Sequence, residues 1–206
     1  MQKFLLFIDA TSTLLGKIAA WAVVLLTVLI GWEVFSRYAL NNPHAWVLDV
    51  QIMLYGALFM LSGAYTLAKN GHVRGDVLYG FLQPRTQATL DLVLYIIFFM
   101  PGIIALTWAG WIYGRESLAI NEQTFSAVPL PLYPFKFVIP LAGFMLLLQG
   151  VVEIIRCLIC LREGEWPSRG EDVVEVDVDK LKAMVHVKDE DIEALDRDLV
   201  MKGTLK

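Results

Sequence analysis

Residues 14–35 read LLGKIAAWAVVLLTVLIGWEVF, and this stretch decides the fold. Only Lys17 and Glu33 are charged among its 22 residues, and both lie near an end of the run. About 20 apolar residues are enough for a helix to cross the hydrocarbon core of a bilayer. A cleavable signal peptide has an apolar region of only about 7–15 residues, whereas this run continues through Trp21 and Trp32. We therefore predict a transmembrane helix.

Three further runs of suitable length follow, and their expected bounds are 50–68, 90–113 and 137–161. The second run carries Gly56 and Gly63 on one side, which should face protein because small residues let helices approach closely in lipid. Pro101, near the middle of the third run, lacks a backbone N–H and should kink its helix. Pro140 falls in the first turn of the fourth run. The sequence thus predicts an all-α membrane protein with four transmembrane helices.

The composition of the whole chain supports this class. Of its 206 residues 57% are hydrophobic and 18% are charged, whereas soluble proteins are about 45–50% apolar. A soluble fold would leave the additional apolar residues in exposed patches, which soluble proteins avoid. Ahead of the first run, Phe7 and Ile8 stand beside Lys3 and Asp9, a pattern that predicts a short N-terminal interfacial helix in the headgroup layer.

The charge of −4 is concentrated in the tail. Residues 162–206 contain 8 Lys and Arg against 13 Asp and Glu, a net charge of −5, whereas residues 1–161 contain 9 against 8, a net charge of +1. Such a tail repels nucleic acid and anionic lipid, so we expect a solvated acidic segment and no nucleic-acid partner. Apolar residues at helical spacing predict one amphipathic helix in it, over 189–201.

Loop charges predict the orientation, because Lys and Arg accumulate on the cytoplasmic side of short loops. Seven cations fall on one side of the four spans: Lys3, Lys17, Lys69, Arg74, Arg85, Arg156 and Arg162. Three fall on the other: Arg37, Arg115 and Lys136. We therefore expect both termini in the cytoplasm. The connection over 113–135 is then external, and its prolines at 129, 131 and 134 favour an extended strap over a regular helix.

Charged groups inside a bilayer are costly, so Glu33 is the leading candidate for chemistry. Arg37 lies four residues later, and we favour an ion pair that anchors the helix over a proton relay. Cys157 and Cys160 face a reducing compartment without two further zinc ligands nearby, so we expect them to pack as small apolar residues. Haem needs histidines inside helices, and this sequence places its three histidines in loops and the tail. We expect no catalytic, cofactor or metal site, and no enzyme.

The segment 37–76 carries a family resemblance. It reads Arg37-Tyr38, then NNPHAW over 41–46, then Asp49, and KNGHVRGD over 69–76 after the second span. Together with VPLPLY over 128–133 and PLAGF over 140–144, it resembles the small membrane (DctQ-like) subunit of tripartite ATP-independent periplasmic (TRAP) transporters, over about residues 10–160. Family members often have an acidic pair after the tryptophan, of which Asp49 is the one acid retained here.

The resemblance implies a bacterial inner-membrane importer of organic acids such as C4-dicarboxylates. A periplasmic binding protein, a transient partner, delivers the substrate to a large membrane subunit that works by sodium symport without ATP. The small subunit forms a stable complex with the large one and acts as its scaffold in the lipid bilayer. The candidate structural and partner contacts are Glu33, Arg37, Asn42, Trp46, Asp49, Gly71, His72, Arg74, Asp76, Pro140 and Gly143.

Local roles follow for some of these residues. Asn42 and Pro43 should form a tight external turn, and Trp46 should lie at the interfacial depth that indole favours. Gly71 should take the left-handed conformation that ends the second helix. His72 and Arg74 should lie beside headgroups or a neighbouring subunit.

Two other functions are consistent with four spans. One is an autonomous small proton-coupled transporter that uses Glu33; against it stands the lack of inverted repeats and broken helices in the sequence. The other is the membrane anchor of a redox complex, which the positions of the histidines disfavour.

Overall fold

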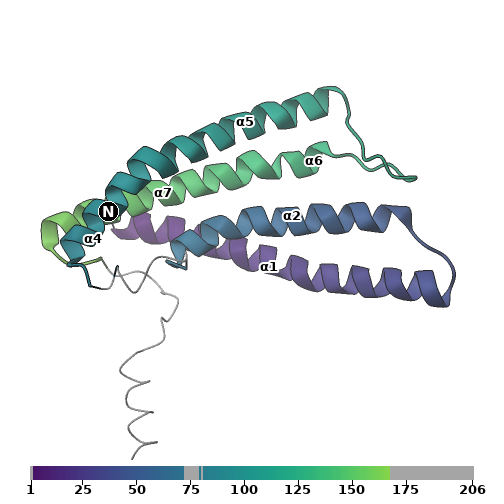
Figure 1. Ribbon diagram of the computed structural model, residues 1–206, viewed down its shortest axis with the longest axis horizontal. Coiled ribbons are helices and arrows are strands. Elements are labelled where there is room, and N and C mark those ends of the chain that lie inside the picture. Colours follow the sequence, from purple (N-terminus) through teal and green to yellow (C-terminus); the bar gives the residue numbers. More distant parts are fainter. Residues whose placement is uncertain (1, 72–78, 80, 168–206) are drawn as a thin grey trace, which may run out of the picture. The chain divides into compact units, whose positions relative to one another are not determined.

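Figure 1 shows a computed structural model of the protein, which describes residues 2–71, 79 and 81–167. Three expected partner contacts, His72, Arg74 and Asp76, lie outside the described residues. So do the acidic tail beyond residue 167 and the helix expected over 189–201.

The described residues form helices and their connections, apart from one isolated bridge between Gln123 and Pro131. The elements are α1 (Gln2–Ala39), α2 (Ala45–Ala68), α4 (Pro84–Leu94), the π-helical turn η1 (Tyr95–Phe99), α5 (Met100–Ala119), α6 (Tyr133–Lys136) and α7 (Val138–Glu163). Since α4, η1 and α5 follow one another without a break, four helical stretches in this part of the chain are long and apolar enough to cross a membrane. This confirms the four predicted spans.

The N-terminal turns differ from the prediction of a separate interfacial helix. α1 is one helix of 38 residues, about 57 Å long at 1.5 Å per residue, against a hydrocarbon core of about 30 Å. The polar residues between its apolar stretches do not end it, because the Thr11 hydroxyl donates to the Phe7 carbonyl and the Ser12 hydroxyl donates to Gln149. Leu5 and Ile8 are buried with Val152 of α7, so the expected short helix is the first part of α1.

The four spans pack as a row in which α1 contacts α2, α2 contacts α7 and α7 contacts α5 (Figure 1). α4 and the first turns of α1 also pack on α7. In the most apolar stretch of each span, 44% of the residues of α7 are buried, against 6% in α1, 11% in α2 and 6% in the helix 84–119. α7 is therefore the central helix.

Prolines mark two further segments. Just ahead of Pro101 the helix widens into the turn Tyr95–Phe99, where the Met100 N–H donates to the carbonyl of Tyr95, five residues back. A π-turn is a common cause of helix irregularity. The expected strap is shorter than 113–135, since α5 continues to Ala119 and α6 forms around Pro134. Proline is tolerated there because it occupies the first turn.

Glycines allow the central helix to approach its neighbours. A Cβ on Gly150 of α7 would lie 2.6 Å from Cε1 of Phe99, and one on Gly110 of α5 would lie 2.7 Å from Cγ2 of Ile139. On α2, a Cβ on Gly56 would lie 2.7 Å from Cζ of Phe135. The small-residue side of α2 therefore faces protein, as predicted.

Candidate functional site

Five buried polar side chains join the N-terminal part of α1 to α7, and we call them the α1–α7 clasp: Asp9, Ser12, Gln149, Glu153 and Arg156. The Ser12 hydroxyl donates to Gln149 Oε1 at 3.1 Å, and Gln149 Nε2 donates to Asp9 Oδ1 at 2.8 Å. Arg156 donates to Asp9 Oδ2 through Nη2 and to Glu153 Oε1 through Nη1, the latter at 2.6 Å. Arg156 thus bridges carboxylates on two helices.

The clasp fixes how α1 lies against α7. Buried charges are costly unless they are paired, and removal of one partner leaves an uncompensated charge. Here the guanidinium of Arg156 contacts both carboxylates, so α1 cannot slide along α7 without breaking an ion pair. The pair within α7 is local, since Glu153 and Arg156 lie three residues apart, whereas Gln149 bonds across to Ser12 and Asp9 of α1. The sequence did not predict the contact of Asp9, because 147 residues separate it from Arg156.

A second cluster, the α1–α2 clasp, consists of Glu33, Arg37 and His44. Arg37 donates to Glu33 Oε1 through Nη2 at 2.7 Å and through Nε at 3.2 Å, which confirms the predicted ion pair. The backbone N–H of His44 also donates to this carboxylate, at 3.2 Å from Oε1, and its ring Nδ1 lies 3.3 Å from Oε2. Glu33 is therefore occupied in joining the end of α1 to the start of α2, an arrangement that fits an anchor better than a relay.

A third cluster, the strap clasp, consists of Tyr113, Glu122 and Lys136. Lys136, counted above as a loop cation, is only 6% exposed. Its ammonium group donates to Glu122 Oε2 and lies 3.8 Å from the centre of the Tyr113 ring. The hydrogen bond from Lys136 holds the pKa of Glu122 below its usual value. The clasp closes the base of the strap on α5 and α6.

Asparagine ends three of the helices. Asn41, Asn70 and Asn121 have φ angles of 52°, 54° and 48°, and they follow α1, α2 and α5. The left-handed residue after α2 is therefore Asn70, and the prediction that Gly71 has this role is wrong. Gly71 instead donates its N–H to the Thr66 carbonyl at 2.8 Å, a hydrogen bond that helps to close the C-terminal end of α2. Asparagine tolerates this conformation because its short polar side chain bonds locally.

The remaining candidates lie on α2, α7 and the loop before α2. Asn42 is held to the end of α1, since its N–H donates to the Ser36 carbonyl at 3.0 Å and its carbonyl accepts from the Ser36 hydroxyl at 2.7 Å. Trp46 is half-buried and its ring packs edge-on against His44, with centroids 6.3 Å apart. Asp49 Oδ2 is buried without a hydrogen bond among the described residues.

Small side chains occupy the contacts of α7. Pro140 and Gly143 are both buried, and Gly143 packs directly on Thr107 of α5. Cys157 and Cys160 pack with Ala88 of α4, which confirms their role as small apolar residues. Within the described part of the chain, no three His, Cys, Asp or Glu side chains are placed to hold a metal ion.

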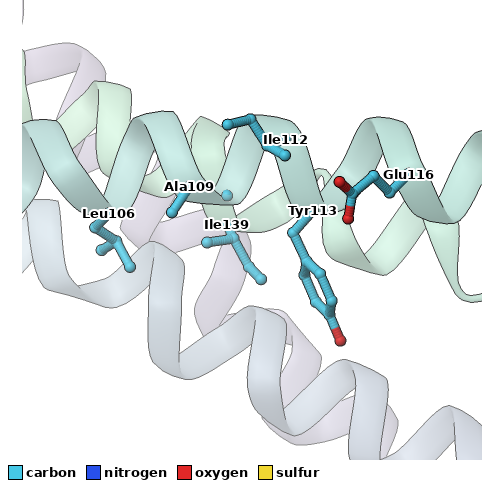
Figure 2. Close-up of a pocket in the computed structure, with 7 residues that line it drawn as sticks. Leu106, Ala109, Ile112, Tyr113, Glu116 and Ile139 are labelled. Carbon is cyan, nitrogen blue, oxygen red and sulfur yellow. The ribbon is translucent and has the colours of Figure 1, made fainter.

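The outer faces of the row are apolar and exposed. On α2 a stripe at helical spacing is uncovered: Leu48, Ile52, Tyr55 and Phe59. α1 exposes a broader surface: Leu14, Ile18, Trp21, Leu25, Val28, Trp32 and Phe35. A groove of about 480 Å³ runs between α5 and α7, and Figure 2 shows Leu106 and Ala109 on its apolar part and Tyr113 and Glu116 near its end.

Taken together, the polar groups of the three clasps hold the helices to one another, and the uncovered surfaces are apolar. These features define a multi-pass helical membrane protein. The family described as "Tripartite ATP-independent periplasmic transporters, DctQ component" matches residues 26–160. The chain belongs to this family, and it is therefore a transporter component and a multi-pass inner-membrane protein. No curated protein matches the chain.

Proposed function

We propose that the chain is the small permease subunit of a TRAP-type secondary transporter, and that it acts as a rigid scaffold for the large membrane subunit. The observation that carries this proposal is the separation of polar and apolar groups. The ionisable side chains of the three clasps pair with one another, while α1, α2 and α5 keep long apolar faces uncovered. A scaffold needs stable faces for a neighbour, and these faces are its working surface.

The whole transporter imports organic acids, and carboxylates are the proposed cargo. A solute-binding protein delivers the substrate, and the large subunit moves it by symport with an ion. Substrate and ion ligands belong to the large subunit in this proposal, because the clasps of this chain already use Glu33, Glu153 and Arg156 in ion pairs.

Both termini are proposed to lie in the cytoplasm. The side that holds the termini carries seven cations, whereas the opposite side carries three, Arg37, Arg115 and Lys136. Lys and Arg accumulate on the cytoplasmic side of short loops, so this excess favours the cytoplasm for both termini.

Copurification and uptake test the proposal. The tagged full chain, extracted from membranes with mild detergent, should bring down a large multi-helix membrane subunit in constant ratio. Deletion of the chain should abolish uptake of the organic acid that the solute-binding protein carries. Isolation of the chain without a membrane partner, or uptake that survives its deletion, would sink the proposal.

A further inference from the structure

The tip of the strap presents an aromatic side chain that the other described residues leave uncovered. Phe125 has a relative exposure of 105%, the highest among the exposed large apolar residues in the described part of the chain. Ala127, Val128 and Pro129 beside it are also exposed. From Gln123 to Phe135 the sequence contains no charged residue. The tip of the strap is therefore an exposed apolar surface without charge.

The loop that carries this surface is ordered by its own hydrogen bonds. The Thr124 N–H donates to the Leu130 carbonyl at 2.8 Å, and the Leu130 N–H donates back to Thr124 Oγ1 at 3.0 Å. The Ser126 hydroxyl donates to the Val128 carbonyl at 2.7 Å. At the base, the Leu132 N–H donates to the Glu122 carbonyl at 2.9 Å. A loop fixed in this way loses little conformational entropy when it binds a partner.

Direction and area indicate the kind of partner. Figure 1 shows the strap as a narrow loop that continues past the ends of α5 and α6. Because the strap connects two helices long enough to span a membrane, its tip lies outside the hydrocarbon core, at the membrane surface. A phenylalanine covers about 150–250 Å², whereas each side of a stable interface contributes about 800 Å². The tip is thus suited to a transient contact, and the permanent contact belongs to the helix faces.

We propose that Phe125 is the anchor by which the small subunit contacts the soluble solute-binding protein, by insertion into an apolar pocket on that protein. This inference rests on the proposed function, which supplies a soluble partner on the side of the strap. Because the tip is uncharged, complementary shape and the burial of apolar surface stabilise this contact. Buried aromatic anchors of this kind carry much of the energy of an interface.

The test uses the complex of this chain with its large subunit in liposomes and the purified solute-binding protein, and it measures their dissociation constant by cosedimentation. Phe125→Ser should weaken binding about tenfold, the effect of losing one anchor. The matched control is Phe81→Ser, since Phe81 is 84% exposed at the opposite end of the helices and should leave binding unchanged. An unchanged dissociation constant for Phe125→Ser, or an equal loss in the control, overturns the inference.

Two further measurements test whether the strap tip instead contacts the large subunit or the membrane. Phe125→Ser should leave copurification with the large subunit intact, and loss of that subunit would place the tip in the permanent interface instead. A dye on a Phe125→Cys variant should respond to added solute-binding protein, whereas a lipid-inserted signal in liposomes alone would assign the tip to the membrane. If the wild-type chain fails to copurify with a large subunit, the proposed function fails. If it copurifies and Phe125→Ser leaves the dissociation constant unchanged, only this inference fails.

Discussion

α1 and α7 are almost equally apolar helices of the same membrane body, yet a much larger share of α7 is buried. In the most apolar stretch of each helix, 44% of the residues of α7 and 6% of those of α1 are buried. What distinguishes α7 is its small and polar residues: Gly143, Gln149, Gly150, Glu153 and Arg156 are all buried. In lipid, close packing and polar contacts drive helix association, because hydrocarbon is as apolar as leucine. Apolar length therefore predicts a span, while small and polar residues predict the inside.

The largest effect should come from removal of the positive charge at the centre of the α1–α7 clasp. Arg156→Met leaves the buried carboxylates of Asp9 and Glu153 without their guanidinium, and should lower the free energy of unfolding by about 3–5 kcal/mol. Thermal unfolding in detergent, followed by circular dichroism, measures the loss. Arg162→Met is the matched control, since Arg162 is exposed in the last turn of the same helix. Equal stability of the two variants would show that the clasp does not hold α1.

A smaller effect should come from the glycine contacts. Gly110→Ala places a methyl group 2.7 Å from Ile139 Cγ2 and 3.2 Å from the Pro140 backbone nitrogen, and should cost about 1–3 kcal/mol. Gly102→Ala on the same helix meets nothing within 4 Å and should be neutral or stabilising, because glycine is a poor helix former. The same unfolding assay compares them. A neutral Gly110→Ala would contradict close packing of α5 on α7.

The α1–α2 clasp should matter less, because Arg37 is half-exposed. Glu33→Gln keeps acceptors for Arg37 and the His44 N–H but removes the ion pair, and should cost about 1 kcal/mol. Uptake by the assembled transporter, measured with the organic acid that its binding protein carries, should persist. Abolished uptake with an intact complex would favour a proton relay at Glu33 instead.

The smallest effect is a pH dependence of the strap clasp. Lys136 lowers the folded-state pKa of Glu122 from about 4.5, so the ionised pair stabilises the strap above that pH. This contribution should be lost as pH falls from about 4.5 through the lowered value. Melting curves of wild type and Glu122→Gln between pH 7 and pH 3 should differ most at pH 7, and the difference should shrink as the pH falls below about 4.5. Parallel curves across the range would rule out the linkage.

The four spans could be predicted because each depends only on an uninterrupted apolar run, and Glu33 with Arg37 because four residues form one helical turn. The long-range partners could not. Asp9 looked like an interfacial charge, and its bond to Arg156 depends on how α1 lies against α7. His44 joins Glu33 through a backbone N–H, which no side-chain pattern reveals. The end of α2 was assigned to Gly71 because glycine is the commonest left-handed residue, although Asn70 precedes it with the same tolerance.

The central claim is that the uncovered faces of this brace belong to a large membrane subunit. Quantitative copurification from native membranes tests it most directly, with the tagged full chain as bait and the subunit ratio as the readout. The account predicts a fixed one-to-one ratio with a large multi-helix protein and no transport by the small chain alone in liposomes. A chain that purifies without that protein and transports a solute by itself would contradict it.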